Sequence, residues 1–144
     1  IRDLPTILEG ISEAISTTRS LMMITEHVRT RLARQLSNAN ANEFGVIPLV
    51  TLSPEWEHAF AESIIGEGDE RQLAMAPTAL QGFITKVRNV LEDLAVKGET
   101  AVLLTSPAIR PFVRSIIERF RPLTVVMSQN EIHPKAKIKT VGQI

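Results

Sequence analysis

The chain has 144 residues, no net charge at pH 7 and 44% hydrophobic residues, so it can build one hydrophobic core and lacks the composition of a disordered chain. Zero net charge excludes bulk electrostatic attraction to nucleic acid, and we expect no nucleic-acid partner. The absence of cysteine excludes a disulfide scaffold, a thiol nucleophile and thiolate metal ligands.

Two amphipathic helices are predicted near the N-terminus. Asp3 is placed to cap the first helix, whose apolar residues recur on one side: Leu4, Ile7, Leu8, Ile11 and Ile15. After a polar break at residues 16–20, the apolar spacing predicts a second helix over residues 21–36. Two helices cannot close a core alone, so their apolar faces need either the rest of the chain or sequence outside it.

A stretch rich in serine and asparagine, residues 37–42, is predicted to be a linker. We therefore expect two parts, a helical segment of residues 1–42 and a small α/β domain of residues 43–144. No stretch approaches the roughly 20 apolar residues of a membrane-spanning helix, so we expect the fragment itself to have no membrane segment. The first residue is not methionine, and we expect a piece of a longer protein.

The second part begins with a strand and two helices. Residues 46–52 form an apolar strand in which Pro48 predicts an edge position or a bulge. The helix that follows is expected to end at the glycine-rich residues 66–69. The range Pro77–Lys97 is the strongest helix prediction in the chain. Its apolar stripe consists of Leu80, Phe83, Ile84, Val87, Val90, Leu91 and Leu94.

The most informative stretch is a strand–helix–strand unit. Val102–Leu104 is a short apolar run, as expected of a strand that is buried on both faces. Ser106 is placed to cap a helix whose first residue is Pro107. Leu123–Met127 supplies a second strand, which a connection of this kind makes parallel to the first.

The last apolar alternation, residues 135–141, carries three lysines on one face and predicts an edge strand. The predicted fold class is therefore α/β: a helical N-terminal segment followed by a small α/β domain with a mostly parallel sheet and an edge strand. One hypothesis for such a domain is a small-ligand-binding or enzymatic module. In that case the loops after Leu104 and Met127 would line the ligand crevice.

The histidine, acidic and hydroxyl side chains form no pattern that predicts a catalytic, cofactor-binding or metal site. His27, His58 and His133 lie far apart, with no partner histidine at helix-face spacing. Asn130 and Glu131 lie near His133, but neither a nucleophile nor a phosphate-binding glycine loop accompanies them. We therefore expect no enzyme and no cofactor.

Some charged and aromatic residues are candidates for binding a protein partner. Arg110 and Arg114 form a basic ridge at i, i+4 spacing, which suits an acidic partner and is equally consistent with ordinary helix surface. Trp56, the only tryptophan, lies among acidic residues and is either buried or an interface anchor. On the second helix, Arg29 lies about 200° around the axis from Arg31, so these two arginines point to different sides.

Three sequence blocks follow one another along the chain: Ile1–Glu9, the residues His27–Gln35, and Ser128–Pro134 with the sequence Ser-Gln-Asn-Glu-Ile-His-Pro. They resemble motifs of the FlhA family, the export-gate proteins of flagellar and virulence-type (type III) secretion systems. The last block resembles the signature near the end of the family, and the blocks occur in the family's order. The run Asn130–Ile132 is closer to the flagellar branch, and the injectisome branch is the alternative; many relatives have tyrosine in place of Gln129.

This resemblance implies a docking platform for export chaperone–substrate complexes, the export ATPase stalk and other export apparatus proteins. It implies a homo-oligomeric ring, a full-length protein in the bacterial inner membrane, and a cytoplasmic position for this fragment. Residues 1–42 would belong to the third cytoplasmic subdomain and residues 43–144 would form the fourth. The resemblance adds Gln129, Asn130 and Glu131 to the candidate partner-binding residues.

We expect the Asn130–Glu131 loop mainly to fix the C-terminal part of the sheet. The loop leaves a strand end at Met127 and returns as the lysine-bearing strand, so its backbone groups need local partners. An asparagine side chain can supply turn hydrogen bonds, so Asn130 is expected to hold the loop while its exposed flank contacts partners.

Overall fold

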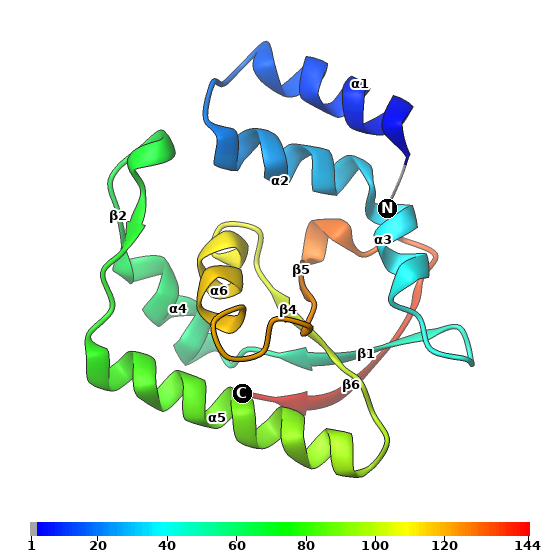
Figure 1. Ribbon diagram of the computed structural model, residues 1–144, viewed down its shortest axis with the longest axis vertical. Coiled ribbons are helices and arrows are strands. Elements are labelled where there is room, and N and C mark those ends of the chain that lie inside the picture. The colour runs from blue at the N-terminus through cyan, green and yellow to red at the C-terminus, as the bar shows by residue number, and fades with distance from the viewer. Residues whose placement is uncertain (1–2) are drawn as a thin grey trace.

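The computed structural model describes residues 3–144, and its centre is a four-stranded sheet in which neighbouring strands are parallel. The strands lie in the order β5-β4-β1-β6, so the lysine-bearing strand β6 forms an edge. The predicted α/β class, with a parallel sheet and an edge strand, is confirmed (Figure 1). The bounds are β1 (Val46–Thr51), β4 (Val102–Thr105), β5 (Val126–Ser128) and β6 (Lys137–Gln143).

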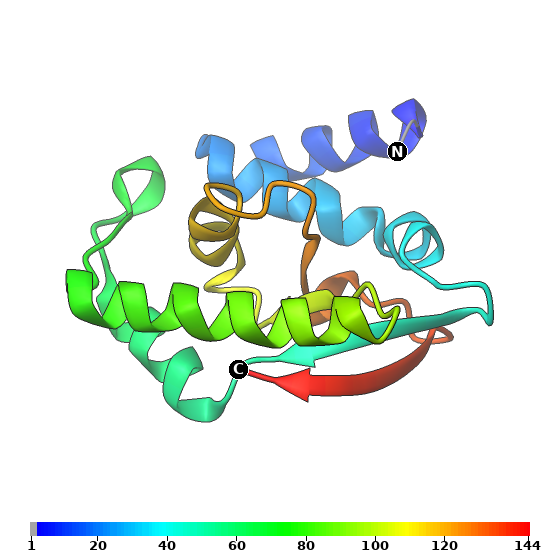
Figure 2. The same cartoon turned by 60° about the horizontal axis from the view of Figure 1, so that its bottom comes forward.

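Alternate residues of a strand point to opposite sides of the sheet, and in β1, β4 and β5 both sets are mostly buried, whereas β6 is largely exposed. One face belongs to a hydrophobic cluster that joins the N-terminal helices to the strands: Leu32, Leu36, Ile47, Leu49, Val102 and Met127. The other face packs against the helices of the second part through Val50, Leu103 and Val126. Figures 1 and 2 show the N-terminal helices on the side of the molecule away from α5 (Pro77–Val96). The N-terminal helices therefore complete one layer of the α/β fold.

Three helices form this N-terminal layer: α1 (Leu4–Ile15), α2 (Leu21–Arg31) and α3 (Ala33–Ala39). The side chain of Asp3 accepts a hydrogen bond from the Thr6 N–H and caps α1, as predicted. The single helix predicted for residues 21–36 is wrong, because the chain breaks at Leu32. The break turns the chain so that Leu32 and Leu36 reach the sheet. The motif residues Ile1 and Arg2 lie outside the described residues.

The apolar stripe of α1 lies mostly outside the core. Four of its five residues are exposed: Leu4, Leu8, Ile11 and Ile15. The buried residues of α1 are Gly10 and Ala14. A Cβ atom at Gly10 would lie 3.2 Å from Cγ2 of Val28, so the missing side chain allows α1 and α2 to lie close together.

The predicted linker is wrong for its first residues, because α3 continues to Ala39. Ser37 is buried, and its hydroxyl donates a hydrogen bond of 3.0 Å to the backbone carbonyl of Glu131. The proposed division of the chain after residue 42 stays a prediction. In the structure, residues from both sides of that division share one hydrophobic cluster.

Helix α5 begins at the predicted residue, Pro77, whereas α6 (Arg110–Ile117) does not begin where the sequence predicts. Helix α4 (Pro54–Ser63) is capped by Ser53, and α5 runs from Pro77 to Val96. Helix α6 begins later than predicted, and Ser106 does not cap it. The late start places Pro111 in the first turn, where a residue without an N–H costs no helical hydrogen bond.

A small hairpin follows α4 where only the end of a helix was predicted. It consists of β2 (Ile64–Ile65), the 3-10 turn η1 (Gly68–Glu70) and β3 (Gln72–Leu73), and Figure 1 shows it projecting from the α/β body. A second 3-10 turn, η2 (Gln129–Glu131), follows β5. None of the helices formed by residues 3–144 has the length and apolar character needed to cross a bilayer.

Pro48 does not put β1 at an edge, because β1 is paired on both sides. Strand β4 pairs with β1 only from Leu49 onward, so at Pro48 the strand β1 is paired with β6 alone. The proline, which has no N–H to donate, therefore lies outside the part of β1 that has two partner strands. A bulge does occur nearby, but its extra residue lies in β6 and not at Pro48. The pairing with β6 shifts between Leu49 and Val50, which leaves Val141 as the extra residue.

The core role of α5 can be tested at Val87, which is fully buried. Val87→Asp places an unpaired charge in the cluster, and we expect it to lower the free energy of unfolding by about 3–5 kcal/mol in urea denaturation. The control Asn89→Asp adds the same charge at an exposed position of α5 and should change stability by less than about 0.5 kcal/mol. Equal unfolding midpoints for the two variants would show that this stripe is not core.

Candidate interaction surface

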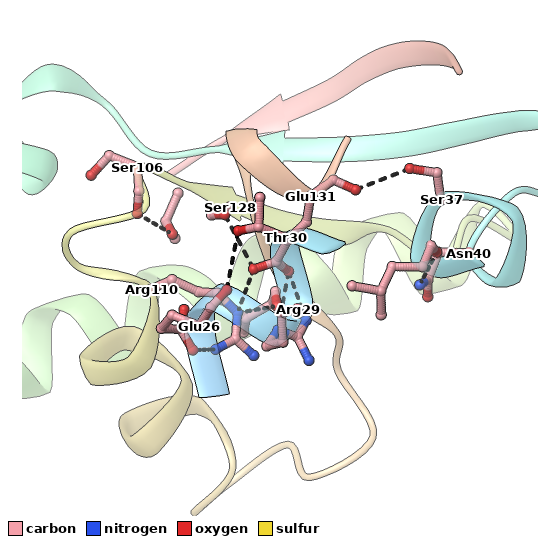
Figure 3. A network of polar contacts seen from close by, with 12 residues as sticks. Glu26, Arg29, Thr30, Ser37, Asn40, Ser106, Arg110, Ser128 and Glu131 are labelled. Carbon is pink, nitrogen blue, oxygen red and sulfur yellow. Dashed lines mark hydrogen bonds and ion pairs between the residues drawn. The ribbon is translucent and has the colours of Figure 1, made fainter. Parts of the chain in front are cut away.

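The Glu131 carboxylate lies at the centre of a buried ion network beside the sheet (Figure 3). Glu131 is 1% exposed, and its Oε1 accepts hydrogen bonds from Nε and Nη2 of Arg29 at 3.2 and 2.7 Å. Its Oε2 accepts a hydrogen bond from the Ser128 hydroxyl at 3.1 Å and lies 3.5 Å from Nε of Arg110. One carboxylate thus contacts guanidinium groups from two helices.

Arg110 extends this network to a second carboxylate. Its Nη1 donates to Oε2 of Glu26 at 2.8 Å, and its Nε donates to the backbone carbonyl of Val126 at 3.1 Å. Nη2 of Arg29 reaches the same carbonyl at 3.4 Å. Two acids and two arginines therefore form a neutral group that ties α2 to α6, β5 and η2.

Burial dominates the electrostatics of the outer pair. Desolvation raises the pKa of Glu26 above its ordinary value of 4.5, although the positive charge of Arg110 opposes this change. Desolvation and the nearby charge of Arg29 lower the pKa of Arg110. The guanidinium stays protonated, because even a lowered arginine pKa lies far above neutral pH.

The loop after β5 is fixed as expected, but by different residues. The Ser37 hydroxyl donates to the carbonyl of Glu131 and accepts the His133 N–H at 2.9 Å, so α3 holds both sides of the turn. The expectation that Asn130 holds the loop is wrong. Asn130 is exposed, and its side chain makes no hydrogen bond to residues 3–144.

The candidate partner-binding residues do not all lie on the surface. The predicted basic ridge is wrong for Arg110, which is 6% exposed, and Glu131 is buried as well. The side chain of Arg114 is one third exposed and lies 3.7 Å from Glu118. Gln129 and Asn130 are exposed on η2.

Trp56 is neither fully buried nor fully exposed. It is half-buried, and its ring packs against Phe83 of α5 with a centroid distance of 5.1 Å. Its remaining surface, together with Arg114, Gln129 and Asn130, stays a prediction for partner contacts.

A hollow of about 580 Å³ lies where the ligand-binding alternative places its crevice, beyond the carboxyl ends of the strands. It is lined by Leu52, Pro54, Glu57, His58, Ala61, Ser106 and Gln129. The Glu57 carboxylate accepts both the N–H and the hydroxyl of Ser106, at 2.9 and 2.8 Å, and so ties α4 to the loop after β4. His58 pairs with Glu62 at 3.0 Å. These contacts stabilise loops, and no group of metal-ligating side chains gathers within residues 3–144.

Sequence reasoning missed the pairing of Arg29 with Glu131, which are 102 residues apart. One signal was present, because Arg29 lies on a different side of its helix from Arg31. Arg31 instead faces α1, where it pairs with Glu9 at 3.2 Å. Spacing alone does not identify the partner of the inward arginine.

Comparison with known proteins places this geometry in context. A model of the FHIPEP family matches residues 1–137. The chain is 60% identical over its full length to the flagellar biosynthesis protein FlhA of Caulobacter vibrioides. It spans 21% of that relative, so the chain corresponds to about a fifth of the curated protein.

Solved structures share the fold over the whole chain. In a structure of the Chlamydia pneumoniae CdsV and CdsO protein complex, the similar chain has a TM-score of 0.81 and 30% identity, and the match covers 100% of this chain and 42% of that one. The nonameric EPEC SctV-C has a TM-score of 0.87 and 24% identity, with coverage of 100% and 43%.

The central carboxylate can be tested by truncation. Glu131→Ala leaves the buried Arg110 and the partly buried Arg29 without their shared partner, and we expect it to cost about 3–5 kcal/mol of unfolding free energy in urea. Asn130→Ala removes a neighbouring exposed side chain and should cost less than about 0.5 kcal/mol. If both variants unfold at the same urea concentration, the network does not hold the loop.

The pKa of Glu26 predicts a pH effect with a definite sign. Because its pKa is raised in the folded chain, the folded state takes up a proton at higher pH than the unfolded state does. The free energy of unfolding of the wild-type chain should therefore increase, relative to that of Glu26→Gln, as the pH falls from 7 toward 4.5. The increase should disappear when the pH is raised again. Urea unfolding of both proteins over this pH range measures the difference; a constant difference, or one of opposite sign, contradicts the assignment.

Proposed function

Because the chain belongs to the FHIPEP family, we propose that it is part of the export gate of a flagellar type III protein export apparatus. The support for the flagellar branch is the 60% identity with a flagellar biosynthesis protein. The chain corresponds to about a fifth of that relative, so the activity of the whole gate is part of the proposal. The injectisome branch is the alternative.

Within the gate, this part of the protein acts as a docking platform. The observation that carries this role is the complex of a 30% identical chain with another protein, CdsO. The partners we propose are the export ATPase stalk, chaperone–substrate complexes and other export apparatus proteins. A buried neutral ion network suits such a role, because it holds the loop after β5 in place while Gln129 and Asn130 remain exposed.

We further propose that the full-length protein lies in the bacterial inner membrane and forms a homo-oligomeric ring on the cytoplasmic side. The exposed apolar stripe of α1 supports further contacts of this chain within a larger assembly, since exposed apolar residues in a row mark interaction surfaces. Arg114, Gln129, Asn130 and the outer part of Trp56 are the proposed contact residues for export partners.

The function is tested by replacing the chromosomal gene for the full-length protein. Deletion should abolish export of flagellar proteins and motility, and the wild-type gene should restore both. Normal flagellar export in the deletion strain would refute the proposed function.

The contact residues need a separate measurement. Gln129→Ala with Asn130→Ala should lower secretion of flagellar proteins while the amount of gate protein stays normal, because both side chains are exposed. Glu131→Ala in the same loop serves as a contrast, since it should lower the amount of gate protein itself. Normal secretion by the double variant would show that Gln129 and Asn130 of η2 are not needed for partner contacts. It would not contradict the proposed export function.

A further inference from the structure

Two adjoining hollows lie between α2, the β2–β3 hairpin and α6. The first has a volume of about 390 Å³ and the second about 480 Å³. Met22 and Pro111 line both hollows, so the two share a wall. None of the contacts described for the export function uses the first hollow.

The first hollow is lined mainly by apolar side chains, and two of them belong to the buried core. Phe112 and Ile116 of α6 are each 5% exposed and belong to the core. Met22 and Met75 supply flexible, polarizable side chains of the kind that adapt to different partner surfaces. Its other apolar residues are Leu73, Leu80 and Pro111.

Its charges are all positive. Arg71 and Arg119 line the first hollow, no acidic residue does, and neither arginine forms an ion pair within residues 3–144. Arg71 is held in place, since its Nε donates to the carbonyl of Gly68 and its guanidinium lies 5.9 Å from the centre of the Phe112 ring. Arg119 is exposed and has no such contacts.

The second hollow adds one more cation, Arg114, which is only partly satisfied. Nη1 of Arg114 is buried and has no hydrogen-bond partner, while Nη2 lies 3.7 Å from Glu118. The acids of this hollow are already engaged, because Glu26 pairs with Arg110 and Asp69 accepts the Ser20 hydroxyl at 2.8 Å. Within the described part of the chain, the first hollow therefore presents an apolar surface with two cations that have no ion-pair partner, and the second hollow adds the unpartnered Nη1 of Arg114.

The shape of the wall favours a helix as the occupant. The lining residues of α6 (Pro111, Phe112, Ser115 and Ile116) follow helical spacing along one side of the helix, and Arg119 in the turn after α6 continues this side. These positions extend over about 12 Å, which is two turns of a partner helix. Ser115 at the middle is small and allows a partner helix to approach closely.

We propose that this surface binds an acidic amphipathic helix of a partner protein. The apolar side of that helix packs into the first hollow, and its carboxylates pair with Arg71, Arg114 and Arg119. The proposal does not require the export function, because it depends only on the walls and charges of the hollows.

The test uses a fluorescein-labelled peptide of about 18 residues, long enough to form a helix in water, with leucines on one side and glutamates on the other. Fluorescence anisotropy measures its binding to the 144-residue chain. There are two control peptides. The first has the same composition in scrambled order, and the second has lysines in place of the glutamates. Only the acidic amphipathic peptide should bind.

Variants of the chain locate the site. Arg119→Glu, which reverses an exposed charge, and Ser115→Trp, which fills the hollow, should each weaken binding about tenfold or more. Lys86→Glu makes the same change in net charge at an exposed position of α5 outside both hollows and should leave binding unchanged. Thermal melting of each variant checks that it is folded.

Three outcomes would overturn the proposal. Binding that is insensitive to both Arg119→Glu and Ser115→Trp would place the peptide elsewhere. Equal binding of the scrambled or the lysine peptide would show that the surface does not select an acidic amphipathic helix. Binding to the 144-residue chain but not to the full-length protein would show that another segment of the same protein occupies the hollows.

Discussion

A carboxylate out of contact with water requires positive charge beside it, and Glu131 obtains that charge from Arg29 on α2 and Arg110 on α6. This requirement determines the relative positions of several elements. Helix α2 has to lie across the end of β5, and α6 has to turn its first residue inward. The loop after β5 has to present the acid between them. Because Glu26 balances the second arginine, the network is neutral and leaves no net charge in the interior.

The two arginines of α6 have different surroundings although they lie on the same helix. Arg110 and Arg114 are four residues apart, yet the first is enclosed by Glu26, Glu131 and Val126 whereas the second opens onto a hollow. The inward arginine anchors the helix against the sheet. The outward arginine and its neighbours then lie on a surface whose backbone is already fixed, which reduces the conformational entropy that this chain would lose on binding a partner.

Local patterns predicted the parts of the fold that depend on local rules. The stripe of α5 and its initial proline define that helix, and the apolar runs around residues 102 and 126 define parallel strands. The same patterns failed where distant contacts decide. Helical spacing cannot tell whether Arg110 faces water, because its partners come from residues 26 and 131. Ser106 has the chemistry of a helix cap but is bound by Glu57, and Ser37 in a polar stretch is needed by the loop at Glu131.

The long-range contacts of α2 and α3 have a consequence for synthesis of the protein. Arg29 and Ser37 find their partners about a hundred residues later in the chain, at Glu131. Until β5 and η2 have left the ribosome, the inner sides of these helices are only partly covered, because Leu32 and Leu36 then have β1 and β4 but not β5 to pack against. The first helices of the chain are thus among the last to reach their final packing. A chain that stops before residue 131 would display an apolar surface that a chaperone has to shield.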